Sequence, residues 1–191
     1  MAAVKEIEKA IKSHQYVHDS IAYVLSPENR NGDEKCCLST CINCNNNGAD
    51  GLALQFRAVR FAFDKDDKIL SHHYVQSFSP NEKITPELAH KIGVELAERV
   101  APGFQIVVAT HIDKDHLHTH FIINSVNYKT GMKWKGDLRQ KSGRKLILVP
   151  KQMVAKSLSR IKLIPSSSAS SNIPSHSSLV SCFTGCSSSV A

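Results

Sequence analysis

The sequence contains no long hydrophobic run. None of its apolar stretches approaches the roughly 18–20 residues that a membrane-spanning helix needs. The N-terminal segment MAAVKEIEKAIKSHQ also lacks the continuous apolar stretch and the small-residue cleavage site of a secretory signal. We therefore expect a cytoplasmic protein with no membrane partner.

Acidic residues are few relative to basic ones. Among 191 residues, 17 Asp and Glu stand against 24 Lys and Arg, which gives a formal net charge of +7. The excess is concentrated in residues 129–162, where eleven basic residues accompany a single acidic one, Asp137. A segment of this kind favours a polyanionic partner.

The six cysteines show no clear disulfide or zinc pattern. They are Cys36, Cys37, Cys41, Cys44, Cys182 and Cys186. Disulfides are disfavoured in the cytoplasm. The CxxC pair Cys41/Cys44 lacks a second ligand pair at fitting distance, because Cys36 and Cys37 are adjacent. We interpret residues 28–50, which are rich in Asn, Gly and Cys, as a long loop with unpaired thiols; a zinc site is the alternative.

The length fits one domain followed by a tail. We assign a folded domain to residues 1–145, a basic linker to 146–164 and a disordered tail to 165–191. The tail is rich in Ser and has too few apolar side chains to offset the entropy of ordering. Such an end is typical of a truncated or frame-shifted longer protein, so we expect the domain itself to be truncated.

Hydrophobic periodicity predicts two helices and four strands. Apolar positions in residues 3–25 have near-helical spacing, and this helix should end before Pro27, because the residue preceding proline disfavours helical geometry. Thr85 caps a second helix, with Pro86 in its first turn and apolar residues recurring every four positions up to Val100. Strands are expected at residues 54–63, 69–78, 104–109 and 121–126, the last two central in the sheet.

Potential metal ligands crowd the segment between the last two strands. They are His111, Asp113, Asp115, His116, His118 and His120. His118 and His120 are two positions apart at the start of a strand, so both rings lie on one face of the sheet. If the two strands are neighbours, His111 completes a set of three nitrogens that leaves coordination positions open, as a catalytic metal requires. A His116/His118 pair, a structural zinc site and a set of surface histidines are the alternatives.

The stretch THIDKDHLHTHFIINSVN resembles the third motif of the relaxases, or mobilization nucleases, of the MobA/VirD2-like type. These belong to the His-hydrophobic-His (HUH) endonuclease superfamily. The resemblance continues upstream through HHYVQSFSPNEKITPELAHKIGVELAE and IAYVLSPENR, and covers roughly residues 5–135. It implies an α+β fold, with a central antiparallel sheet of about five strands flanked by helices. It also implies that residues 1–145 form the nicking domain.

The resemblance assigns roles to individual residues. Tyr23, just before a Pro-Glu turn, would be the nucleophile; Tyr16, seven residues earlier on the same helix face, is the alternative. The metal, Mg²⁺ or Mn²⁺, would be held by His111, His118 and His120. Asp115 is the favoured carboxylate, with Asp113 as the second choice, to orient a ligand histidine or tune its basicity at the catalytic centre. His116 would be a substitute ligand, and Asn124 would support a ligand or bind phosphate.

DNA contacts are expected at two places. Gln76-Ser77-Phe78 resembles the second relaxase motif, so Ser77 would contact DNA beside the scissile phosphate, and His73 could do the same. Single-stranded DNA also needs positive charge with aromatic platforms. Lys133, Trp134, Lys135 and Arg139 could supply both, with a solvated basic linker as the alternative.

The function that these residues indicate is metal-dependent, site- and strand-specific DNA nicking with strand transfer. It would occur at a plasmid or transposon origin of transfer, through a 5′-phosphotyrosine intermediate. The partners would be single-stranded or supercoiled origin DNA and relaxosome accessory proteins. Two alternatives are a rolling-circle replication initiator or transposase of the same superfamily, and a truncated remnant that binds metal and single-stranded DNA without cutting.

Overall fold

A computed structural model describes residues 3–7, 11–135 and 147–148. The strands are β1 Ala3–Glu6, β2 Cys36–Ile42, β3 Ser71–Ser77, β4 Ile106–His111, β5 His118–Asn124 and β6 Ile147–Leu148. The helices are α1 His14–Leu25, α2 Gly48–Ala62 and α3 Pro86–Val100. The expected tail at 165–191 and, apart from β6, the expected linker at 146–164 lie outside the described residues.

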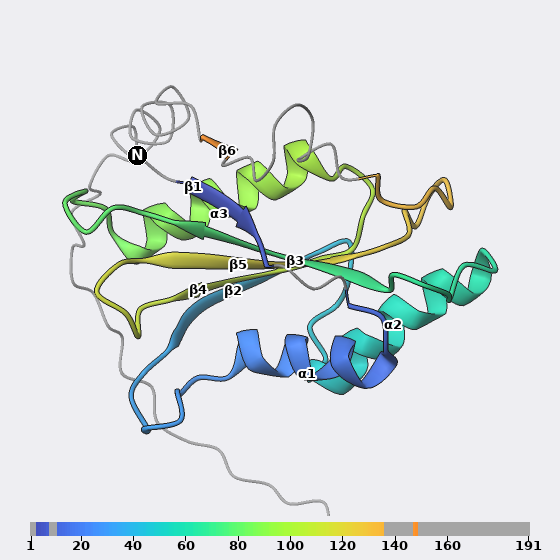
Figure 1. Ribbon diagram of the computed structural model, residues 1–191, viewed down its shortest axis with the longest axis horizontal. Helices are drawn as coiled ribbons and strands as arrows, with labels where there is room; N and C mark the ends of the chain where they lie inside the picture. Colours follow the sequence, from blue (N-terminus) through green and yellow to red (C-terminus); the bar gives the residue numbers. More distant parts are fainter. Residues whose placement is uncertain (1–2, 8–10, 136–146, 149–191) are drawn as a thin grey trace, which may run out of the picture.

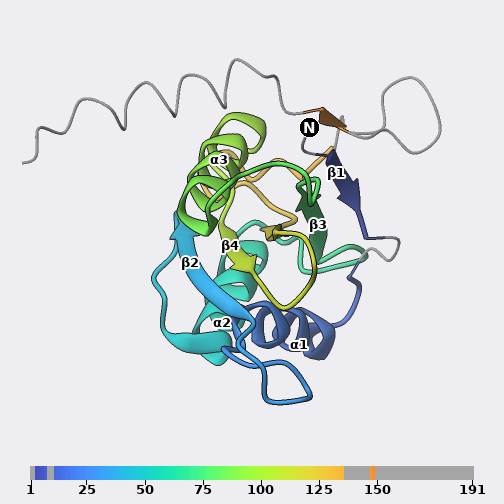
Figure 2. The same cartoon turned by 90° about the vertical axis from the view of Figure 1, so that its left-hand side faces the viewer.

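One antiparallel sheet with the strand order β2-β4-β5-β3-β1-β6 organises the chain. Helix α3 covers one face of this sheet, and α1 and α2 lie together on the other (Figure 1, Figure 2). The expected α+β class, a central antiparallel sheet flanked by helices, is confirmed. None of the helices in the described part of the chain is both long and apolar enough to cross a bilayer.

Strands β4 and β5 are buried at every position because helices cover both faces of the sheet there. Alternate residues therefore enter two different cores. Ile106, Val108 and Phe121 face α3, whereas Val107 and Ile122 face α1 and α2. The expectation of two central strands is confirmed.

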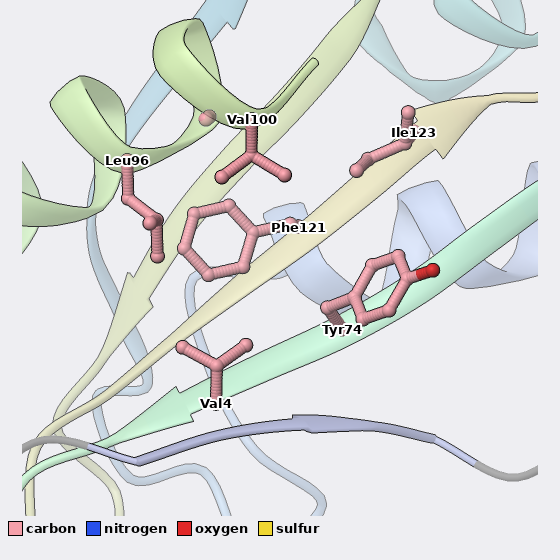
Figure 3. A pocket seen from close by; sticks show the side chains of 7 residues that line it. Val4, Tyr74, Leu96, Val100, Phe121 and Ile123 are labelled. Atoms are coloured by element: carbon pink, nitrogen blue, oxygen red, sulfur yellow. The ribbon is translucent and has the colours of Figure 1, made fainter. Parts of the chain in front are cut away.

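Helix α3 packs closely on the sheet. A Cβ at Gly93 would lie 2.8 Å from Thr119 Cγ2, so a side chain there would push the helix outward. Beside this contact, an apolar pocket of about 20 Å³ remains between α3 and strands β1, β3 and β5 (Figure 3). Such a volume holds roughly one water molecule, so the pocket is a packing gap in the core.

The strand expected at residues 54–63 is wrong, because these residues belong to α2. The helix buries Leu52, Phe56 and Arg60, which recur every four positions along one face. Phe61, 76% exposed, and Leu54, 67% exposed, lie outside that face. Their hydrophobicity produced a misleading alternation with period two.

Residues 28–50 are not a continuous loop. Strand β2 at the sheet edge pairs with β4, and α2 begins at Gly48. The sequence of β2, CCLSTCI, does not alternate between apolar and polar residues. Most of its residues are half-buried, so its two faces do not differ in the side chains they require. Its cysteines and Cys44 are free thiols.

The first predicted helix is too long. Among the described residues of this segment, only His14–Leu25 is helical, with Ser13 Oγ accepting the capping hydrogen bond of Tyr16 N–H. Ala3–Glu6 instead forms β1, held in register by β3. The end of α1 before Ser26-Pro27 and the α3 cap by Thr85 agree with expectation, as does the strand β3.

Candidate metal and tyrosine site

Antiparallel pairing of β4 and β5 assembles a group of three imidazoles. His111 lies directly opposite His118 in the register, and His120 follows two residues later on the same face. The ring centroids of His111 and His120 are 4.5 Å apart, and those of His118 and His120 are 5.1 Å apart. One ring nitrogen from each of the three lies within 4.8 Å of the other two. These three side chains can therefore hold one metal ion.

Two of the three rings have a buried nitrogen with no hydrogen-bond partner among the described residues. His111 Nε2 lies 2.8 Å from the Val24 carbonyl oxygen, which can only accept, so Nε2 carries the proton and Nδ1 is left with a lone pair. His120 Nδ1 lies 2.9 Å from His73 Nε2, and His120 Nε2 has no partner. Unpaired buried acceptors are costly unless a ligand satisfies them. The donor set thus fits a divalent cation.

The third histidine is held by the turn that precedes β5. His118 Nδ1 lies 3.2 Å from the His116 carbonyl oxygen, and His118 Nε2 lies 3.6 Å from Asp113 Oδ1. Asp113 Oδ1 is buried, and no hydrogen bond to another described residue satisfies it. Asp115, in contrast, is exposed on the turn. Asp113, rather than the favoured Asp115, is therefore the carboxylate that reaches a ligand histidine.

His116 lies outside the group of three nitrogens. Its ring centroid is 5.6 Å from that of His118, and the residue precedes the first residue of β5. Because His116 is not on the strand, it does not share the alternation that places His118 and His120 on one face. The alternative pair His116/His118 is not the one that the structure brings together with His111.

Burial keeps these imidazoles neutral at neutral pH. It lowers the pKa of His111 to about 4, against a weaker opposing effect of the hydrogen bond to Val24. It lowers the pKa of His120 to about 2, with the neighbouring histidines adding to the effect. The pKa of His118 is also lowered by burial. Neutral imidazole is the form that coordinates a metal.

We expect the metal-free protein to lose stability as the pH falls from about 6.5 towards 4. Histidines of the unfolded chain take up protons near pH 6.5, whereas those in the folded chain resist until about pH 4. The unfolded state then binds more protons, so the free energy of unfolding falls by up to about 1.4 kcal/mol per pH unit for each such histidine. Urea unfolding in EDTA at pH 7.5 and 5.5 measures this. The free energy of unfolding of the His73→Gln variant should depend less on pH than that of wild type. An identical change between the two pH values in both proteins would contradict the prediction.

Tyr23, in the last turn of α1, lies beside the three histidines. Its ring centroid is 6.1 Å from that of His111 and 6.0 Å from that of His120, and the side chain is 53% exposed. The hydrogen bond between His111 and Val24 ties this end of α1 to β4. Tyr16 lies two turns earlier on α1 and has no ring contact with the histidines in the described part of the chain. The structure therefore brings Tyr23, and not Tyr16, to the candidate metal site.

Lys35 is a residue of this site that the sequence did not reveal. Its Nζ lies 3.5 Å from the centroid of the Tyr23 ring and donates a hydrogen bond to the Tyr23 carbonyl oxygen. The residue is only 3% exposed. Burial lowers the pKa of Lys35, and the nearby Asp113 carboxylate opposes this effect. A lysine before an irregular edge strand has no distinguishing pattern, so no sequence signal pointed to it.

The expected DNA contacts on β3 have different surroundings. Ser77 is half-buried and lies opposite His118 in the β3–β5 register, at the edge of the candidate site. His73 is bonded to His120 instead of facing solvent. Burial lowers the pKa of His73 to about 4. In this position His73 can orient the ring of His120, and its expected contact with DNA stays a prediction.

Asn124 lies at the other end of β5, roughly 13 Å along the strand from His120. It is fully buried, accepts a hydrogen bond from Arg60 Nη1 and donates to the Phe56 carbonyl and Gln105 Oε1. The expectation that Asn124 supports a metal ligand or binds phosphate is therefore wrong. Its amide joins α2 to the sheet.

We expect Asn124→Ala to lower the free energy of unfolding by about 2–4 kcal/mol without weakening metal binding by the three histidines. The substitution removes one acceptor of the buried Arg60, which keeps its bonds to Asp66 and to the Leu70 carbonyl. It also leaves Gln105 Oε1 without its donor. Urea unfolding checks the first effect. Titration of the folded variant with metal checks that binding is unchanged. A large loss of metal affinity without loss of stability would contradict the structural role of Asn124.

The predicted basic and aromatic groove is not assembled at the histidines. Trp134 packs against Phe104 with ring centroids 5.1 Å apart and donates from Nε1 to Tyr74 Oη, on the α3 side of the sheet. Lys133 pairs with Asp67. Lys135 is exposed at the end of the described segment, and Arg139 lies outside the described residues. Trp134 is therefore partly buried against the core, and its expected role as a platform for bases stays a prediction.

Two histidines on one strand, separated by Thr119 where the motif name has a hydrophobic residue, fit the HUH class of nucleases together with the third histidine and the adjacent tyrosine. Residues 23–152 match the family described as "Relaxase: MobA/VirD2-like, nuclease domain". The match covers more than half of the chain, and the chain belongs to this family. The family inferred from the motifs is thereby confirmed.

Several proteins share sequence with the chain. It is 42% identical to "Protein rlx" of Staphylococcus aureus over 100 residues. This alignment covers 52% of this chain and 30% of the relative. It is 42% identical over 83 residues to "Group II intron-interrupted relaxase LtrB" of Lactococcus lactis subsp. cremoris (strain MG1363), covering 40% of this chain and 15% of that protein. The matched part is less than a third of either relative.

A solved structure described as "Molecular Basis of Vancomycin Resistance Transfer in Staphylococcus aureus" also aligns with the chain. The alignment has a TM-score of 0.45 and 12% sequence identity, and covers 84% of this chain and 87% of the other.

Proposed function

We propose that this chain nicks one DNA strand at an origin of transfer and remains joined to the 5′ end of that strand through Tyr23. The observation that carries the proposal is the position of Tyr23, about 6 Å by ring centroid from two histidines that each have one buried nitrogen without a partner among the described residues. Membership of a nuclease-domain family supports the same reaction. The family match favours a relaxase over the replication initiator and the transposase.

The reaction that we propose is a transesterification. Tyr23 Oη attacks the phosphorus, the Oη–P bond forms and the P–O3′ bond breaks, and the departing 3′ oxygen takes a proton while the phenol loses one. Because the phosphotyrosine ester preserves the energy of the broken bond, a free 3′-hydroxyl can reverse the step and reseal the strand. Nicking then becomes strand transfer, as mobilization of a plasmid or an integrative element requires.

The histidines and Lys35 have separate tasks in this proposal. His111 Nδ1, His120 Nε2 and a ring nitrogen of His118 would hold Mg²⁺ or Mn²⁺, which supplies charge neutralisation at a non-bridging phosphate oxygen. His73 and the Val24 carbonyl fix the orientation of His120 and His111. Lys35 Nζ lies over the face of the Tyr23 ring and would place a positive charge beside the phenol.

The test is formation of a covalent adduct by the 191-residue chain. End-labelled single-stranded oligonucleotides that tile the genetic element encoding the chain are incubated with Mg²⁺, Mn²⁺ or EDTA, and adducts are detected on denaturing gels. We expect one strand-specific adduct with either metal and none with EDTA. If the chain binds metal but forms no adduct with any oligonucleotide, it is a binding module that does not cut DNA, and the proposal is overturned.

The wider setting is proposed on the same basis. Origin DNA in single-stranded or supercoiled form would be the substrate, with relaxosome accessory proteins as partners, in the cytoplasm. We propose that the nicking domain corresponds to residues 1–145.

A further inference from the structure

A hollow of about 770 Å³ opens beside Tyr23, on the side of α1 that faces the segment before β2. Tyr23 and Lys35 form part of its wall, so the hollow adjoins the proposed nucleophile. The remaining lining residues are Asp19, Ala22, Ser26, Glu28, Asn29, Arg30, Asn31, Asp113 and Lys114. Its volume lies in the range of about 300–1,000 Å³ that is usual for ligand pockets, so it has room for a nucleotide.

The wall opposite α1 is a preformed loop. Lys35 N–H donates to the Pro27 carbonyl over 2.7 Å, which closes the loop at its base. Asn29 Oδ1 accepts from the backbone of Asn31 and Asp33, and Gly32 adopts a positive φ of 84° at the tip. Arg30 and Asn31 are therefore held at an exposed position. Neither side chain is engaged by a hydrogen bond or ion pair with another described residue.

The charges in the hollow are mixed: Asp19, Glu28 and Asp113 supply carboxylates, and Arg30, Lys35 and Lys114 supply cations. Asp19 accepts from Gln15 and pairs with His18, and Asp113 lies beside His118. Among the cations, Lys114 is 61% exposed and only 3.8 Å from Asp113, a loose contact. Arg30 and Lys114 are thus available to a phosphate that enters the hollow.

The geometry of the reaction decides which part of the DNA strand fits here. In an in-line displacement the leaving 3′ oxygen departs on the side of phosphorus opposite to the attacking oxygen. The DNA on the 5′ side of the nick therefore leaves away from Tyr23. The DNA on the 3′ side keeps the phosphorus and stays attached to Tyr23, so it needs space next to the phenol.

We infer that this hollow binds the nucleotides on the 3′ side of the nick, with Arg30 and Lys114 contacting their phosphates. The inference rests on the proposed function and deepens it: the hollow holds the strand that is retained on Tyr23. Bound there, the 5′ end stays in place until a 3′-hydroxyl arrives for resealing.

The test compares two substrates that differ only on the 3′ side of the nick. The short oligonucleotide ends one nucleotide after the nick, and the long one extends several nucleotides further. Adduct formation by the full chain is measured for wild type, for the double variant Arg30→Gln/Lys114→Gln, and for Lys91→Gln/Arg99→Gln. The last variant removes the same charge from exposed positions of α3, on the opposite face of the sheet.

We expect wild type and the α3 control to react better with the long substrate. The Arg30/Lys114 variant should match wild type on the short substrate but lose about tenfold in kcat/KM on the long one. The salt dependence of its kcat/KM on the long substrate should also weaken. The slope of log(kcat/KM) against log[salt] should fall in magnitude by about 1.4, which corresponds to two lost phosphate contacts. If the Arg30/Lys114 variant loses kcat/KM equally on both substrates, or on neither, the inference about the hollow is overturned while the proposed function stands. No adduct by wild type on either substrate overturns the proposed function itself.

Discussion

Replacing Tyr23 with Phe is expected to abolish the covalent protein–DNA adduct and to reduce nicking by at least about 10³-fold. The substitution removes only the oxygen that would form the bond to phosphorus. Tyr23 is half-exposed, and its ring contacts with His111, His120 and Lys35 do not involve the hydroxyl group. The free energy of unfolding should therefore change by less than about 0.5 kcal/mol, and the metal affinity should remain.

Tyr16→Phe is the matched control for this prediction. Tyr16 lies on the same helix and is exposed to a similar degree, 47%, but it is away from the histidines. This variant should form adduct at the wild-type rate. Gel analysis of adducts with a labelled 3′ segment measures both proteins side by side. An adduct that persists in Tyr23→Phe would place the nucleophile on another residue and remove the basis of the proposed mechanism.

Replacing His118 with Ala is expected to weaken Mn²⁺ binding by at least about 100-fold and nicking by at least about 10³-fold. The three histidines form one donor set, and two ligands bind a cation much less strongly than three do. His118 also connects the set to Asp113. Calorimetric titration with Mn²⁺ gives the affinity, and the adduct assay gives the activity.

His116→Ala is the control, because His116 lies two residues away but outside the group of three nitrogens. Its metal affinity should stay within a few-fold of wild type, since the substitution keeps the backbone carbonyl oxygen that His118 Nδ1 contacts. The opposite pattern, with His116→Ala losing the metal and His118→Ala keeping it, would establish the alternative His116/His118 arrangement. Urea unfolding of both variants separates loss of binding from loss of fold.

Local signals predicted the central part of the fold well. The α3 helix has its cap, its proline and its four-residue apolar spacing within one segment, and β4 and β5 are short runs rich in β-branched residues. Strand β1 and the edge strand β2 were missed because they are stabilised by pairing with β3 and β4, which are distant in sequence. The α2 helix was mistaken for a strand because exposed apolar residues such as Phe61 obscured its buried face.

The sequence by itself singled out His111, His118 and His120 as the preferred ligand set, since two-residue spacing on a strand places His118 and His120 on one face; the pairing of β4 with β5 then decided that His111 lies beside them. The sequence also singled out Tyr23 through a motif. Only the tertiary structure decided what surrounds them: the Lys35 ammonium over the Tyr23 ring, the pairing of His73 with His120, and the anchoring of His111 by Val24. These partners are 12, 47 and 87 residues apart in the chain. Helix and strand periodicities carry information over a few residues, whereas such contacts arise only when the sheet and α1 pack together.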